Sequence, residues 1–213
     1  SVQGQVGIGH TRWATHGAPT DKNAHPHLSQ NRKVAIVHNG IIENFLTLKK
    51  ELQKKGYIFR SETDSEIIAN LIEDELNQGQ SLLNAVKNSV KNIKGTYALS
   101  IISTTDPEKI IVTKKASPLI IGIGEDENFI ASDINALTPH TKNILYLEDN
   151  EFAILTKKNI KIEKNNKEVI KKPQTIKWDH TTTEKQGYPH YMLKEIYEQP
   201  QVIRTILSKY VKN

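Results

Sequence analysis

Three polar features of this chain suit the binding of a free amino acid and the stabilisation of an acyl-transfer intermediate. Arg12 offers a planar guanidinium that can bind a carboxylate through two parallel hydrogen bonds, which lysine cannot do. Asp64 opens a predicted helix, where the helix dipole favours the ionised carboxylate that would bind an ammonium group. Asn39 and Gly40 offer a side-chain amide and an unshielded backbone N–H, which together can form an oxyanion hole.

Each of these features also has an interpretation without a ligand. Arg12 can form a salt bridge at a strand end, and Asn39-Gly40 is a dipeptide typical of turns. Asp64 can serve the helix N-terminus alone, because a carboxylate is favourable there in any case. Considered singly, each residue leaves both alternatives open.

Histidines are concentrated early in the chain, at positions 10, 16, 25, 27 and 38. A metal site is one interpretation, but His25-Pro26-His27 lacks i, i+4 spacing and no cysteine or carboxylate completes a recognisable ligand set. Gly122-Ile123-Gly124 lacks the third glycine and the following helix of a dinucleotide fingerprint. We therefore predict no metal and no cofactor, and expect the histidines to line a pocket or form hydrogen bonds.

The helices that position these residues are predicted from apolar spacing and capping signals. Residues 44–55 fit a helix that stops at Gly56. Thr63-Asp64-Ser65-Glu66 matches a capping box at the start of a second helix. A third helix is predicted over residues 82–93 and is closed by Gly95.

Short strands account for most of the remaining chain. Residues 5–11 and 33–38 fit strands, and the second of these ends at Asn39-Gly40. Seven more β-rich runs follow the third helix, at residues 97–103, 110–114, 119–123, 129–132, 144–147, 152–155 and 160–163. Strands, helices and then many strands predict an α+β fold with a large antiparallel content.

The C-terminal part has a different pattern. Residues 173–189 form a predicted polar connector, and the apolar spacing after His190 predicts a helix that Pro200 should kink or break. We therefore divide the chain into a domain over residues 1–189 and a helical connector over residues 190–213.

Composition favours a soluble protein of the cytoplasm. The chain has 213 residues, of which 37% are hydrophobic and 25% charged. No apolar run approaches the roughly 18 residues that span a bilayer, and the N-terminus has no signal-peptide pattern. With no cysteine there are no disulfides, which suits a reducing compartment.

The net charge of +5 owes much to eight lysines between residues 157 and 177. A nucleic-acid surface would use such charge to neutralise phosphates. The alternative is a hairpin at a sheet edge, turned at Asn165-Asn166, whose lysines face water. The hairpin is favoured because no aromatic residues intersperse with the lysines, so we predict no nucleic-acid partner.

The order of short motifs resembles one family over nearly the whole chain. These motifs are HTRWATHG, NAHPH, VHNGIIEN, SETDSE, SPLIIGIG, ENFIASD and HYMLKEIYEQP, beginning at residues 10, 23, 37, 61, 117, 127 and 190. In this order they resemble the glutaminase domain of the glutamine–fructose-6-phosphate aminotransferase family, a branch of the class II glutamine amidotransferases. RWATHG together with KEIYEQP is the most specific part of the resemblance.

The resemblance implies a fold and an activity. The fold is that of the N-terminal-nucleophile hydrolases, a four-layer α-β-β-α sandwich. The activity in the parent enzyme is hydrolysis of L-glutamine to glutamate, with ammonia passed to an isomerase domain that converts fructose 6-phosphate to glucosamine 6-phosphate. The parent is expected to be a homo-oligomer, and the segment after His190 to lead toward the isomerase domain.

The same resemblance assigns roles to seven residues by motif position. Arg12 would bind the α-carboxylate of glutamine and Asp64 its α-amine. Asn39 and Gly40 would supply the oxyanion hole. Three residues would line the pocket in a loop that closes over the substrate: Trp13, Thr15 and His16.

This sequence departs from the family pattern at both ends. The family's nucleophile is an N-terminal cysteine several tens of residues before HTRWATHG, whereas nine residues precede His10 here and the chain has no cysteine. Ser1 is a poor substitute because it lies at the entrance of the predicted strand that carries His10. We expect a glutaminase-domain fragment that is incomplete at its N-terminus and inactive alone. The alternative is a non-catalytic module that binds glutamine or glutamate.

Overall fold

The computed structural model describes residues 4–176 and 185–210. The chain forms two compact units, Ser1–Thr175 and Ile176–Asn213. The boundary between these two units lies after residue 175. The boundary predicted after residue 189 separates a glutaminase domain from a connector, and that division by function stays a prediction. The first unit holds both sheets and all of the predicted site residues.

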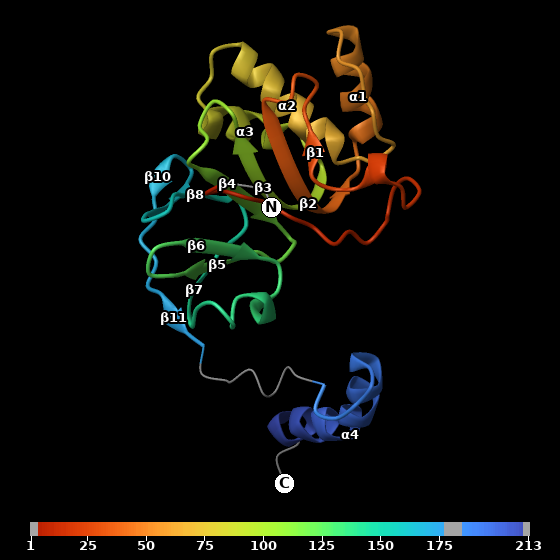
Figure 1. The fold of residues 1–213 in the computed structure, drawn as a ribbon, viewed down its shortest axis with the longest axis vertical. Helices are drawn as coiled ribbons and strands as arrows, with labels where there is room; N and C mark the ends of the chain where they lie inside the picture. Colours follow the sequence, from red (N-terminus) through yellow and green to blue (C-terminus); the bar gives the residue numbers. More distant parts are fainter. Residues whose placement is uncertain (1–3, 177–184, 211–213) are drawn as a thin grey trace. The chain divides into compact units, whose positions relative to one another are not determined.

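Two antiparallel sheets form the centre of the first unit (Figure 1). The seven-stranded sheet has the order β1 (His27–Leu28), β2 (Val34–Ile42), β3 (Gly95–Ser103), β4 (Ile110–Lys115), β8 (Glu151–Leu155), β9 (Ile160–Lys164), β10 (Lys167–Glu168). The four-stranded sheet has the order β11 (Gln174–Thr175), β7 (Asn143–Tyr146), β5 (Ile120–Ile123), β6 (Asn128–Ala131). All neighbouring strands in both sheets run antiparallel, as predicted.

Three helices cover one face of the seven-stranded sheet (Figure 1). They are α1 (Phe45–Lys54), α2 (Glu66–Asn77) and α3 (Leu82–Lys91), and two 3₁₀ turns, η1 (Asp21–Asn23) and η2 (Ile134–Ala136), lie in loops. The helices pack because their apolar residues recur at helical spacing, so that Leu48, Leu52, Ile68 and Ile72 all face the sheet.

The seven-stranded sheet has a core on each face because its side chains alternate. Leu99 and Ile111 join the core beneath the helices, whereas their neighbours Ala98 and Val112 join the core against the four-stranded sheet. This arrangement is an α+β sandwich. Residues 4–176 supply the helix, sheet and sheet layers of the predicted four-layer order.

Most elements agree with the sequence-based predictions, including all seven strands after α3. The predicted helix over residues 44–55 is α1, and Gly56 follows it with a φ of +90°. Asn165 and Asn166 turn the β9–β10 hairpin with positive φ angles. Its lysines pair with carboxylates, as in Lys164–Glu148 (3.1 Å) and Lys161–Glu163 (2.9 Å), which supports the hairpin interpretation of the basic segment.

Four local predictions are wrong. Residues 5–11 form no strand, because an extended segment needs a paired neighbour and glycines 7 and 9 supply no side chains to pack. The strand predicted to end at His38 continues to Ile42. Gly95 is the first residue of β3 and not the stop of α3, which ends at Lys91. The predicted connector over 173–189 contains β11, which pairs with β7; its residues 177–184 lie outside the described residues.

The predicted capping box of α2 is also wrong. The helix begins at Glu66, its N-cap is Ser65 and no side-chain capping bond forms. The Glu66 carboxylate instead accepts hydrogen bonds from the backbone N–H groups of Arg60 (2.8 Å) and Ser61 (2.6 Å). Glu66 therefore organises the preceding loop, because its carboxylate satisfies the backbone N–H of the buried Ser61 and that of Arg60.

The second unit contains one long helix, α4 (Tyr191–Tyr210). Pro200 lies within it, and Figure 1 shows the ribbon of α4 changing direction along its length. Pro200 thus bends the helix without ending it, because proline removes one hydrogen bond and clashes with the preceding turn.

The contribution of the helix–sheet core can be measured at Ile72, which is fully buried in α2. We expect Ile72→Ala to lower the free energy of unfolding by about 2–5 kcal/mol, because it leaves a cavity between α2 and the sheet. The matched control is Leu46→Ala, whose side chain on α1 is largely exposed and whose loss should cost less than about 0.5 kcal/mol. Equal losses in urea unfolding would contradict this packing.

Candidate active site

All seven predicted site residues line one small cavity of about 70 Å³. The loop that follows the N-terminal segment provides one wall, β2 a second, and the residues before α2 a third. The cavity is lined by Arg12, Trp13, Thr15, His16, Asn39, Gly40 and Asp64, together with His10, His25, His38, Thr63 and Ser65. Four separate stretches of the sequence therefore meet at one point.

Arg12 holds its own loop in this structure. Its guanidinium donates hydrogen bonds to the carbonyl oxygens of His16 (2.9 Å), Gly17 (3.0 Å) and Ala18 (3.0 Å). The backbone of Arg12 is in the left-handed region, with a φ of +50°. These bonds use both terminal nitrogens of the guanidinium, so a carboxylate that bound both nitrogens would compete with the carbonyl groups, and binding at Arg12 is coupled to the conformation of residues 16–18.

The loop is fixed at its far end by Asn23, which is fully buried. The Asn23 amide donates to the Ala18 carbonyl (3.0 Å), and its oxygen accepts from the Glu62 N–H (2.9 Å). Trp13 lies on the same loop with 92% of its surface exposed, so its indole forms only part of the cavity rim. The loop is thus anchored near the helical layer and open at Trp13.

Asp64 is buried, with 2% of its surface exposed. It lies two residues before the first residue of α2 and not in the first turn of the helix, because the helix starts at Glu66. Its Oδ2 accepts a hydrogen bond from the Ile42 N–H at 2.7 Å, and its Oδ1 lies 4.0 Å from His16 Nδ1. Oδ1 also accepts a longer bond from Ser65 Oγ (3.4 Å), which leaves acceptor capacity toward the cavity.

Asn39 and Gly40 lie within β2, opposite Ala98 and Tyr97 of β3. The turn interpretation of this dipeptide is therefore wrong. Gly40 has a φ of +132°, and a Cβ atom there would lie 2.1 Å from the Thr96 carbonyl oxygen. Glycine is required because the two strands approach closely at this point.

The early histidines line the cavity or form hydrogen bonds beside it, and three of them lie in contact with one another. His25 contacts His10 with the two rings tilted by 41° and their centroids 4.4 Å apart, and it contacts His27 edge to face with the centroids 4.6 Å apart. Burial lowers the pKa of His25 to about 3, and neighbouring histidines contribute in the same direction. Burial also lowers the pKa of His27 to about 4, against a smaller opposing effect of Glu66, and lowers the pKa of His38. These imidazoles are neutral at pH 7.

The histidine group does not form a metal site in the part of the chain that the structure describes. Across residues 4–176 and 185–210, no three histidine or carboxylate side chains are arranged to hold an ion. His38 uses Nδ1 to contact Ser65 Oγ (2.9 Å), and His27 uses Nε2 to contact Thr63 Oγ1 (3.1 Å). Both rings tie the sheet to the loop before α2.

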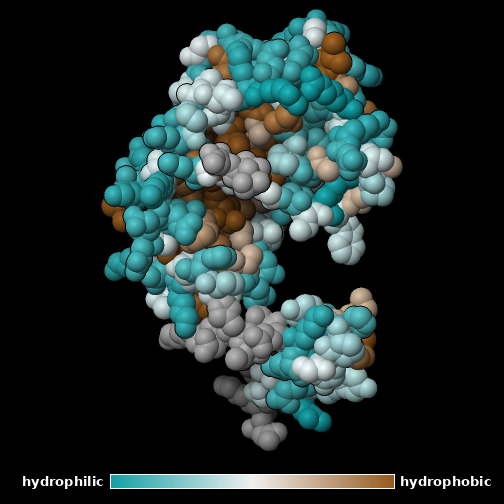
Figure 2. Space-filling view, in the orientation of Figure 1, coloured by the Kyte–Doolittle hydropathy of each residue, from teal (hydrophilic) through white to brown (hydrophobic). Residues whose placement is uncertain are grey.

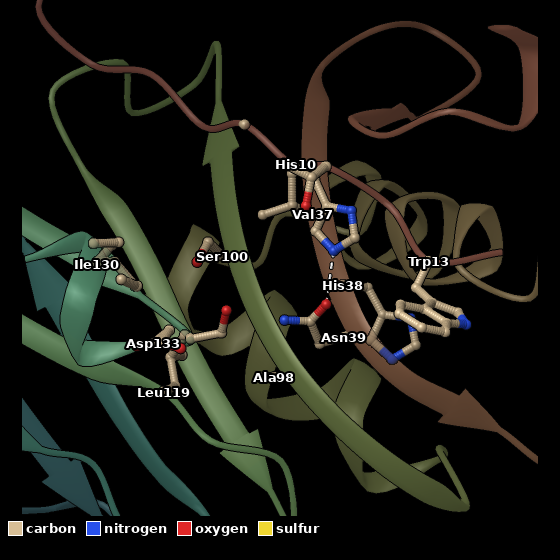
Figure 3. Close-up of a pocket in the computed structure, with 15 residues that line it drawn as sticks. His10, Trp13, Val37, His38, Asn39, Ala98, Ser100, Leu119, Ile130 and Asp133 are labelled. Carbon is tan, nitrogen blue, oxygen red and sulfur yellow. Dashed lines mark hydrogen bonds between the residues drawn. The ribbon is translucent and has the colours of Figure 1, made fainter. Parts of the chain in front are cut away.

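A second cavity of about 430 Å³ adjoins the first and lies between the two sheets (Figure 3). His10, Trp13, His38 and Asn39 line both cavities. The wall that the site predictions missed comes from the four-stranded sheet and its loops: Leu119, Ile130, Ala131, Ser132, Asp133 and Ala136. Figure 2 shows apolar side chains gathered in the hollow between the helical layer and this sheet.

The fold and the site together define an α+β sandwich with a small polar pocket beside β2. A family model described as a glutamine amidotransferase domain matches residues 1–193. The chain belongs to this family.

Curated relatives narrow the comparison. The chain is 50% identical over 208 residues to the glutamine–fructose-6-phosphate aminotransferase (isomerizing) of Clostridium acetobutylicum, and 51% identical over 208 residues to that of Aquifex aeolicus. Each alignment covers 97% of this chain but only 34% and 35% of the relative. The chain therefore spans about a third of the length of the curated relatives it matches.

Solved structures support the fold. Glutamine phosphoribosylpyrophosphate amidotransferase from B. subtilis, complexed with ADP and GMP, aligns with a TM-score of 0.60 and 31% identity. A structure of the allosteric regulatory enzyme of purine biosynthesis aligns with a TM-score of 0.61 and 32% identity. Each alignment covers 73% of this chain and 34% of the other.

The close approach of the strands at Gly40 can be tested by substitution. We expect Gly40→Ala to lower the free energy of unfolding by more than about 2 kcal/mol, because strain at positive φ adds to a clash with a backbone carbonyl. Gly56→Ala is the control: its φ is also positive, but nothing lies within 4 Å of the added Cβ, so it should cost about 1 kcal/mol. Similar losses in chemical denaturation would show that the clash is absent.

The neutral histidines predict a pH dependence of stability. Below the ordinary pKa of 6.5 the unfolded chain binds protons that folded His25 and His27 do not, so stability should fall as the pH drops from 6.5 toward 4. The loss at pH 5 should be about 1 kcal/mol per histidine, after allowance for partial solvent exposure.

Urea unfolding at pH 7 and pH 5 measures this effect. His25→Gln should reduce the loss, whereas His190→Gln, at an exposed position outside the cluster, should leave it unchanged. A His25→Gln chain that keeps the full pH dependence would contradict the burial argument.

Proposed function

We propose that this chain forms the L-glutamine pocket of a glutaminase. Arg12 binds the α-carboxylate and Asp64 the α-ammonium group, while Asn39 and Gly40 face the γ-carbonyl oxygen. Trp13, Thr15 and His16 form the wall that closes on the ligand. The observation that carries this proposal is the meeting of a guanidinium, a buried carboxylate and an amide around one cavity.

The reaction of such a site is acyl transfer. A thiolate adds to the γ-carbonyl carbon of glutamine, and the negative charge that develops on its oxygen is stabilised by the Asn39 amide and the Gly40 N–H. The amide nitrogen takes up a proton and leaves as ammonia as the carbon–nitrogen bond breaks, and water then hydrolyses the thioester to glutamate and the free thiol. The 213 residues contain no cysteine, so we expect this chain to bind glutamine without releasing ammonia.

The larger cavity is the side from which we propose the nucleophile approaches. It shares Asn39 with the pocket of Arg12 and Asp64 and has a volume of about 430 Å³, which leaves room for a further chain segment. In a longer protein that supplies the thiol, ammonia would serve the conversion of fructose 6-phosphate to glucosamine 6-phosphate, as the relatives' names suggest. We further propose a cytoplasmic homo-oligomer, with residues 190–213 leading toward the isomerase domain.

No helix within residues 4–176 or 185–210 is both long and apolar enough to cross a bilayer. We propose neither a membrane nor a nucleic-acid partner.

A second candidate function is binding of glutamine or glutamate without catalysis. The lack of cysteine favours it, because every other part of the proposed pocket is retained. The two candidates differ in ligand preference. A sensor of either amino acid gains from tight binding of glutamate, whereas a glutaminase must release glutamate as product.

Binding of L-glutamine to the 213-residue chain tests the proposal. We expect Arg12→Lys and Asp64→Asn each to weaken binding about 10-fold or more in isothermal titration, because lysine cannot make two parallel hydrogen bonds to the carboxylate and asparagine lacks the negative charge that binds the ammonium group. Arg60→Lys and Asp21→Asn are matched controls at exposed positions outside the pocket and should change affinity less than about twofold. Equal effects of the site and control variants would refute the assignment.

Ammonia release under the same conditions gives a second readout. A homogeneous preparation of the chain that hydrolyses glutamine would show that a residue other than cysteine is the nucleophile. Binding of glutamate more tightly than glutamine would favour the sensor.

A further inference from the structure

His10 makes two hydrogen bonds that fix the positions of its ring protons. Its Nδ1 accepts a hydrogen bond from the backbone N–H of Arg12 at 2.8 Å. A nitrogen that accepts from an N–H carries no proton, so the neutral ring must carry its proton on Nε2. His10 is therefore held as the Nε2–H tautomer.

The second hydrogen bond of His10 fixes the amide of Asn39. His10 Nε2 lies 2.7 Å from Asn39 Oδ1, and because Nε2 is the donor, the atom that faces it must be the amide oxygen. The two ends of an asparagine amide are otherwise similar in shape. The Asn39 NH2 group consequently points away from His10, toward the cavity where Ser100 and Asp133 lie (Figure 3).

The orientation matters because the amide has opposite chemistry at its two ends. Its NH2 group stabilises a developing oxyanion, whereas its oxygen repels one. An Asn39 side chain that could flip would present the wrong end for part of the time. Gly40, the next residue along β2, has no side chain that could hold the Asn39 amide in one orientation.

We infer that His10 is a positioning residue that turns the Asn39 NH2 group toward the carbonyl oxygen of a bound amide. The inference rests on the proposed function for the identity of that amide. The same ring holds the N–H of Arg12, where the backbone adopts its positive φ. One imidazole thus links the proposed carboxylate-binding residue to the proposed oxyanion hole.

Two substitutions separate the two hydrogen bonds of His10. A glutamine amide nitrogen reaches about as far as the imidazole Nε2, so His10→Gln can still donate to Asn39. An asparagine side chain reaches only the position of Nδ1, so His10→Asn can still accept from Arg12 but cannot donate to Asn39. Each variant therefore keeps one of the two hydrogen bonds of His10 and loses the other.

The tautomer is measured first, on the 15N-labelled 213-residue chain without ligand. Two-bond 1H–15N spectra are expected to show a protonated Nε2 and a bare Nδ1 for His10. The Asn39 side-chain NH2 resonances should shift in His10→Asn and stay near their wild-type positions in His10→Gln. A protonated Nδ1 on His10 would overturn the inference. Asn39 NH2 resonances that shift in neither variant would overturn it too.

Ligand binding is measured next, with L-glutamine and with L-norvaline, which lacks the γ-carbonyl group. His10→Asn should weaken L-glutamine binding about 3- to 10-fold and leave L-norvaline binding unchanged, whereas His10→Gln, which loses only the acceptor for the Arg12 N–H, should change the affinity for both ligands by the same factor. Equal losses for the two ligands in His10→Asn would mean that His10 only supports the loop, which also overturns the inference. If neither ligand binds the wild-type chain, the proposed function fails, and the tautomer and Asn39 spectra still decide the role of His10.

Discussion

The site depends on the alternation of side chains along β2 and on its close pairing with β3. His38 faces the helical layer, Asn39 faces the other sheet, and the N–H of Ile42 holds Asp64. A shift of one residue in the pairing would exchange these faces and place each polar group in the wrong layer. Gly40 prevents the shift, because only glycine fits against the β3 backbone at that position.

The buried charges of the site are satisfied by backbone groups. The Asp64 carboxylate accepts from the Ile42 N–H, and that of Glu66 accepts from the N–H groups of residues 60 and 61. A buried carboxylate needs such donors to offset the loss of water. The nearby His25 and His27 are neutral, since burial lowers the pKa of each, so they add no positive charge that would compete with a ligand ammonium group for Asp64.

The sequence predicted elements well where one local pattern decides the structure. Short β-rich runs separated by turn residues predicted the seven later strands, and apolar spacing predicted α1 to α3. It failed where a distant partner decides: Asn39-Gly40 is a turn signal, yet β3 pairs across it, and Glu66 fits a capping box, yet it bonds residues 60 and 61. Motif order brought the seven site residues together, but the role of His10 depends on contacts that spacing does not encode.

Asn39 lies between two cavities whose walls differ in polarity. The smaller one is polar and carries opposite charges on Arg12 and Asp64, which suits recognition of the two charged groups of an amino acid. The larger one has an apolar wall from the four-stranded sheet, which suits a packed chain segment more than a charged ligand. Asn39 lines both, so in the proposed reaction an amide carbonyl bound in the first cavity would meet a group arriving through the second beside this one side chain. The proposed reaction therefore depends on the orientation of that side chain, because its NH2 end has to face the carbonyl oxygen of the bound amide.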